Sequence, residues 1–244
     1  MRKTAHNAQD IVCVFEECWK QFVKDYDAKR LLNVYCSEAD TQLHFASLLL
    51  KKLQFPPTCV YVEFPIPFNV EDFIFDRLSL GRPIRKMKKG SGIIADIVVM
   101  GAHDIVPFII AEIKYSPLIW NYLPIFQAID GKLSVGRREK IRNELRSTIN
   151  RLKKWEAYGP SINLILGYLK NMDKIIGLIR EFKDISEVPV HYYLCIIEEI
   201  YPNLKKLLQE EIKKHNPPDE LKLLFHFNPM RSWLEEQLNK MCRE

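Results

Sequence analysis

The sequence predicts an α/β domain with a mixed central sheet, and three observations favour this fold class. Residues 93–100 and 107–115 are two apolar, β-branched runs joined by the short segment GAHDIV, a spacing typical of an antiparallel hairpin. After residue 136, amphipathic helical patterns alternate with apolar runs of strand length. The 244 residues contain no repeat and no low-complexity linker. We therefore expect a single domain over residues 1–244.

The N-terminal half is expected to contain two helices followed by strands. Apolar residues recur at helical spacing over residues 8–24. A second helix is expected to start near Ser37, a good N-cap, and to end before two prolines. Residues 58–68 have strand character with prolines near the end, and the basic segment 77–92 is expected to be a loop that enters the hairpin.

The C-terminal half is expected to alternate helices and strands. A long amphipathic helix over residues 137–158 should end at Gly159-Pro160. The periodicities then predict a strand over 161–169, a helix over 172–182, a strand over 191–200 and helices over 201–215 and 229–241, with a short apolar run at 221–227. We expect the core of the domain over about residues 37–197, with helical additions over 1–36 and 198–244.

The sequence argues against a membrane-spanning protein and against a fold held together by zinc or disulfides. No apolar run is long enough to span a membrane, and the N-terminus is a poor signal peptide, so we expect a cytoplasmic protein with no membrane partner. The six cysteines form no CxxC pair, which indicates reduced thiols and neither a zinc site nor a disulfide framework.

Three charged residues interrupt the apolar hairpin, namely Asp96, Glu112 and Lys114. Strand side chains alternate between faces, so Glu112 and Lys114 share one face. If the hairpin is centred near residue 104, Asp96 lies opposite Glu112, with Cβ atoms about 5 Å apart. Two such carboxylates repel each other unless they bind a proton or a hard cation such as Mg²⁺. The alternative is a buried salt-bridged cluster with no chemistry, which is costly to maintain.

Two segments are strongly basic, which indicates either solvated faces or surfaces that contact phosphates. Residues 77–92 hold six basic residues and no acid, and residues 132–154 hold nine basic residues against two acids. The candidate nucleic-acid-binding residues in these segments are Arg82, Arg85, Lys86, Lys88, Lys89, Arg137, Arg138 and Arg142.

Asp96 followed by Glu112-Ile113-Lys114 resembles the PD-(D/E)xK signature of the restriction-endonuclease-like nuclease superfamily, although Ala95 stands where the family has proline. The resemblance covers about residues 37–197. It implies a restriction-endonuclease-like αβββαβ core whose second and third strands are the hairpin. It also implies a Mg²⁺ ion, with Mn²⁺ as a substitute, held by Asp96, Glu112 and the backbone carbonyl of Ile113. Glu38 matches the glutamate that many members place on the first core helix, pointing at the metal, so the resemblance implies that Glu38 is a catalytic residue that adds a metal ligand, directly or through water.

The resemblance implies a metal-dependent endonuclease that hydrolyses phosphodiester bonds of DNA in preference to RNA. Lys114 would position the attacking water. Two alternatives stay open: a catalytically silent nucleic-acid-binding or assembly module with this fold, and a metal-dependent hydrolase of a small phosphoester. A homodimer would suit paired cuts in a duplex, and the last helix, with Trp233, Leu234 and Leu238, could supply its interface.

Overall fold

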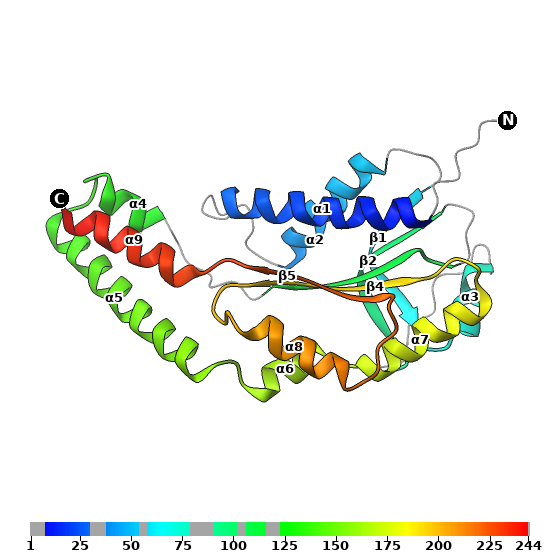
Figure 1. Ribbon diagram of the computed structural model, residues 1–244. Helices are drawn as coiled ribbons and strands as arrows, with labels where there is room; N and C mark the ends of the chain where they lie inside the picture. Colours follow the sequence, from blue (N-terminus) through cyan, green and yellow to red (C-terminus); the bar gives the residue numbers. More distant parts are fainter. Residues whose placement is uncertain are drawn as a thin grey trace.

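A mixed β-sheet lies at the centre of the molecule, with helices on both of its faces (Figure 1). The computed structural model describes residues 8–29, 38–53, 58–78, 90–101, 106–115 and 123–243. Within these ranges the sheet has five strands in the order of the chain: β1 (Thr58–Pro67), β2 (Gly92–Gly101), β3 (Ile109–Tyr115), β4 (His191–Glu198) and β5 (Leu221–Phe227). The first three strands pair antiparallel and the last three pair parallel, so the predicted mixed sheet is confirmed.

The helices fall into three groups (Figure 1). One face of the sheet is covered by α1 (Ala8–Lys29) and α2 (Glu38–Lys52). The other face is covered by α3 (Val70–Leu78), α6 (Ile162–Tyr168), α7 (Met172–Ile185) and α8 (Leu204–Lys213). Away from the sheet, α4 (Leu123–Ile129), α5 (Val135–Tyr158) and α9 (Met230–Arg243) pack together; we call these three helices the arm.

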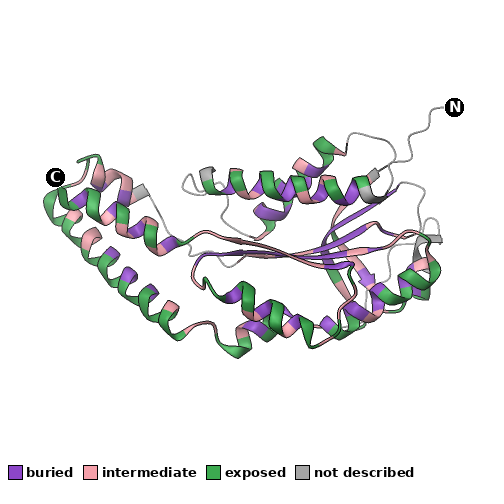
Figure 2. Ribbon diagram, viewed as in Figure 1, coloured by how far each residue is buried: buried purple, intermediate pink, exposed green. Residues whose placement is uncertain are grey.

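The burial pattern follows these groups, with buried stripes on the helix faces that meet the sheet (Figure 2). The core between the sheet and α1 and α2 is aromatic. Phe45 of α2 lies at its centre, fully buried, with its ring centroid 5.2 Å from that of Phe15 and 5.5 Å from that of Trp19. The predicted helical spacing of α1 and α2 therefore produces the face that docks both helices on the sheet.

The arm has an apolar core of its own. Leu145, Ile149 and Leu152 of α5 are buried against α4 and α9. Leu234 of α9 is buried in this core, and Trp233 and Leu238 pack against it partly buried, so the arm itself covers part of the apolar face that was considered as a dimer interface.

One predicted element is wrong. Residues 161–169 were expected to form a strand, but they form helix α6 and the turn after it. The Ser161 hydroxyl accepts a hydrogen bond from the Leu164 N–H at 3.2 Å and caps this helix. Only one side of the apolar run is buried, through Ile165 and Tyr168, as helical periodicity requires.

Several elements add to the prediction. Helices α3 and α4 were not expected, and residues 221–227, taken only as an apolar run, form the edge strand β5. The region after residue 198 therefore extends the sheet as well as adding helices. None of the helices in the described ranges is long and apolar enough to cross a membrane. The described cysteines, Cys13, Cys18, Cys59, Cys195 and Cys242, are free thiols.

Candidate active site

The β2–β3 hairpin has the predicted register. Ile97 pairs with Ala111 and Val99 pairs with Ile109, and this register places Asp96 opposite Glu112. The backbone ladder stops at the Ile97–Ala111 pair. Beyond it, the Ile113 N–H donates to Asp96 Oδ2 at 2.5 Å. The Asp96 carboxylate thus takes the place of a backbone acceptor where the two strands separate.

The usual alternation of side chains breaks at Asp96. Ala95 is buried in the core beside α7, yet Ile97, two residues further on, is buried in the core beside α1 and α2. The partner strand changes faces at the opposite position, Glu63, whose φ of +52° is unusual for a residue with a side chain. Asp96 therefore lies at a twist that turns it out of both apolar cores and toward β3.

Glu112 is held from two sides. Its Oε1 atom lies 2.6 Å from Nζ of Lys114, which shares its face of β3. Its Oε2 atom accepts a hydrogen bond from the Tyr192 hydroxyl at 2.6 Å. Tyr192 is fully buried on the neighbouring parallel strand β4. The Lys114 ammonium group and the Tyr192 hydroxyl therefore fix the orientation of the Glu112 carboxylate.

Helix α2 contributes two side chains to the same place. Glu38 and Gln42 lie one helical turn apart, so both face the hairpin. The Gln42 amide donates to Asp96 Oδ1 at 2.8 Å, and Glu38 Oε1 lies 3.9 Å from Lys114 Nζ. These contacts form two groups. Glu112, Glu38 and Tyr192 are joined through Lys114 and Glu112, whereas Asp96 contacts Gln42 and the Ile113 N–H. Charge interactions couple Asp96 to Lys114, Glu112 and Glu38.

Sequence reasoning missed Gln42 and Tyr192. Gln42 had a detectable signal, because it lies at helical spacing with Phe45, Ala46 and Leu49 on the buried face of α2. A polar side chain on such a face needs a partner. Tyr192 had no comparable signal, since tyrosine is an ordinary residue in a buried strand.

Burial and neighbouring charges shift the pKa values of three ionisable groups in the site. Burial raises the pKa of Asp96 to about 6, and the negative charges of Glu112 and Glu38 act in the same direction, against the Ile113 N–H and Lys114. Burial also raises the pKa of Glu38. For Lys114, burial acts to lower the pKa, but the carboxylates of Glu112, Asp96 and Glu38 together outweigh burial and the pKa is raised. Lys114 is therefore a cation. A further positive charge near Asp96 would favour the ionised form of the Asp96 carboxyl group.

The ligand set suits a hard cation in chemistry but is not gathered around one point. Carboxylate oxygens are the ligands that Mg²⁺ prefers, and two carboxylates with several waters are a common arrangement. Among the described residues, no group of three or more Asp, Glu, His or Cys side chains is placed to hold a metal ion. Lys114 Nζ lies 2.6 Å from Glu112 and 3.9 Å from Glu38. Both Asp96 oxygens accept hydrogen bonds, one from the Gln42 amide and one from the Ile113 N–H.

The predicted nucleic-acid-binding residues are spread over two regions. Arg82, Arg85, Lys86, Lys88 and Lys89 lie outside the described residues. Arg137 and Arg138 lie at the start of α5 in the arm, where Arg137 is exposed. Arg142 has a structural role in the arm, because its Nη2 atom donates to the Met241 carbonyl of α9 at 2.8 Å.

The arm and the candidate site belong to the same end of the sheet (Figure 1). Glu112 and Lys114 lie in the last part of β3, and the parallel strand β5 runs on through Asn228 and Pro229 into α9.

No family model, curated protein or solved structure matches the chain.

Proposed function

We propose that the protein is a Mg²⁺-dependent nuclease that hydrolyses phosphodiester bonds of DNA at Asp96, Glu112 and Lys114. The observation that carries the proposal is the hairpin register, which brings a buried aspartate opposite the glutamate of an ExK sequence. The order of α2, three antiparallel strands, intervening helices and the parallel strand β4 supports the αβββαβ core of the PD-(D/E)xK superfamily.

Each side chain has a distinct role in this proposal. Asp96 and Glu112 would hold the Mg²⁺ ion, and Mn²⁺ would substitute for it. When bound, the ion lowers the pKa of its water well below the bulk value of about 15.7. Gln42 and the Ile113 N–H orient the Asp96 carboxylate. Lys114, kept protonated by the surrounding carboxylates, would orient the attacking water and stabilise negative charge on the phosphate.

The direct test is cleavage of supercoiled plasmid and of single-stranded DNA with Mg²⁺ or Mn²⁺, against the same reactions in EDTA. We expect nicking that needs the metal and is lost in Asp96→Asn, whereas Asp184→Asn, an exposed aspartate of α7, should cut normally. Salt-sensitive DNA binding without cutting would instead identify a catalytically silent binding module. Hydrolysis of a small phosphoester without cleavage of DNA would identify a metal-dependent hydrolase of small phosphoesters.

Replacing Tyr192 with phenylalanine is expected to weaken metal binding by about tenfold or more, because Glu112 loses the hydroxyl that orients it. Isothermal titration with Mn²⁺ measures this effect without any cleavage. The phenylalanine ring keeps the packing of this fully buried position.

The adjacent residue offers a matched control. The Tyr193 hydroxyl donates to Glu16 Oε1 at 2.8 Å, so Tyr193→Phe also removes a hydrogen bond to a carboxylate. That bond lies on the opposite face of β4, toward α1. Equal Mn²⁺ affinity in the Tyr192→Phe and unchanged proteins would contradict the role assigned to Tyr192.

A further inference from the structure

Large apolar side chains are exposed together where α5 turns into α6. Tyr158 is 86% exposed, Ile162 60%, Leu166 51% and Trp155 40%. Single exposed apolar residues are normal, but several on adjoining helical turns indicate a surface that meets a partner. Neither the candidate active site nor the core of the arm uses these side chains. We call these four residues the α5–α6 corner.

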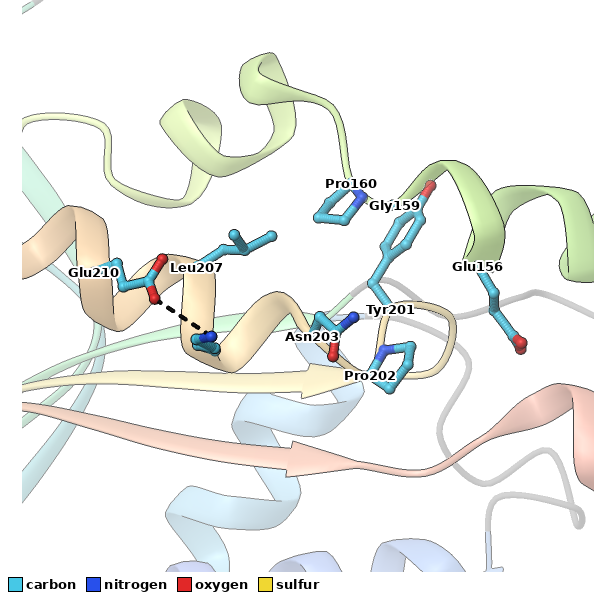
Figure 3. A pocket seen from close by; sticks show the side chains of 9 residues that line it. Glu156, Gly159, Pro160, Tyr201, Pro202, Asn203, Leu207 and Glu210 are labelled. Carbon is cyan, nitrogen blue, oxygen red and sulfur yellow. Dashed lines mark ion pairs between the residues drawn. The ribbon is translucent and has the colours of Figure 1, made fainter.

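A pocket of about 290 Å³ opens beside this corner (Figure 3). Its walls are Gly159 and Pro160 on one side and Tyr201, Pro202 and Leu207 on the other. Gly159 has a φ of +72°, which lets the chain turn sharply between the two helices. The volume lies just below the range typical of small-ligand pockets, and the Tyr201 ring gives the pocket one aromatic wall.

Positive charge surrounds the corner. Lys153 and Lys154 of α5 and Lys205 and Lys206 of α8 are exposed, as is Lys170 in the turn after α6. Lys153 is paired with Glu235 of α9 at 3.2 Å. The two acids at the pocket are neutralised within the chain, since Glu156 binds Arg231 at 2.8 Å and Glu210 lies 3.8 Å from Lys206. Of the lysines, Lys154, Lys170 and Lys205 form no ion pair with any described residue.

We infer that the α5–α6 corner binds unpaired bases of a DNA strand, so that the substrate of the proposed nuclease contains single-stranded DNA. The inference rests on the proposed function and adds its substrate class. Aromatic side chains beside lysines bind single strands, because bases stack on the rings while the ammonium groups contact phosphates. A second copy of this chain would fit less well, since it would bring the same cluster of lysines against this one.

The test measures binding in EDTA, so that no cleavage takes place. The probe is a single-stranded oligonucleotide carrying 2-aminopurine, whose fluorescence is quenched by stacking. Tyr158→Ala is expected to weaken binding about tenfold and to reduce the quenching, and Tyr158→Phe should restore both. Because Tyr158 is so exposed, neither change should affect folding. Val135→Ala, at the opposite end of α5 and 74% exposed, is the control.

Each other outcome overturns the inference. Unchanged affinity of Tyr158→Ala for the single strand would show that Tyr158 is not a stacking surface. An equal loss of affinity for duplex DNA would show that the corner has no preference for unpaired bases. A dimer that dissociates in Tyr158→Ala, measured by light scattering, would assign the corner to a second copy. Failure of the nuclease proposal is distinguishable from these results: a protein that binds the probe through Tyr158 but never cuts with Mg²⁺ keeps the single-strand binding site and loses both the catalytic function and the substrate assigned to it.

Discussion

Replacing Lys114 with methionine is expected to reduce DNA cleavage at least about a hundredfold while the protein stays folded. Methionine keeps an unbranched chain of similar length but removes the ammonium group, which lies 2.6 Å from Glu112 and 3.9 Å from Glu38. The Lys114 side chain is 27% exposed, so water can reach the Glu112 and Glu38 carboxylates when the ammonium group is absent. Single-turnover cleavage with Mg²⁺ measures the loss, and thermal unfolding checks the fold.

A second lysine serves as the control for this change. Lys174 of α7 donates to the Gly90 carbonyl at 3.2 Å and lies 5.0 Å from the centre of the Phe68 ring, away from the candidate site. Lys174→Met should therefore cut at the normal rate. Cleavage by Lys114→Met within a few-fold of the unchanged protein would remove this residue from the catalytic machinery.

Replacing Phe45 with alanine is expected to lower the free energy of unfolding by about 3–5 kcal/mol. The ring is fully buried and contacts Phe15, Trp19 and Phe22 of α1, so its loss leaves a cavity where α1 docks on α2. Domains of this kind are stable by only about 5–15 kcal/mol, so the change uses much of that margin. Urea unfolding followed by circular dichroism measures it.

The same helix provides the comparison. Leu43 lies two residues before Phe45 but is 61% exposed, so Leu43→Ala should change the unfolding free energy by less than about 0.5 kcal/mol. Similar losses for both variants would contradict the contribution assigned to the buried aromatic core.

The part of the fold nearest the site was predictable because local rules determine it. A short turn between two β-branched runs fixes an antiparallel hairpin, and strand alternation then fixes which residues face each other. The register of the hairpin was predicted in this way and is confirmed at the Ile97–Ala111 pair, whereas the break in alternation at Asp96 was not predicted. Glu38 was expected only from the resemblance to the nuclease superfamily, and its Oε1 atom lies 3.9 Å from Lys114 Nζ.

The rest depended on contacts that are distant in the sequence. The apolar run at 161–169 has the length of a strand, and only its packing on the sheet reveals that one side is buried. Residues 221–227 become a strand because β4 offers them a parallel edge. Tyr192 reaches Glu112 from another strand, 80 residues away along the chain. Periodicity within a segment carries no information about such partners.

The arm has a consequence for the order of folding. Helix α5 is made long before α9, yet α9 supplies Met230, Leu234 and Met241 to the core that buries Leu145 and Ile149. During synthesis, α5 therefore emerges with its apolar face uncovered, after the hairpin of the candidate site has already been made. Chains form their domains from the N-terminus onward, and uncovered apolar surface promotes aggregation. The arm should thus be the last part of the molecule to become native and the part most dependent on chaperones.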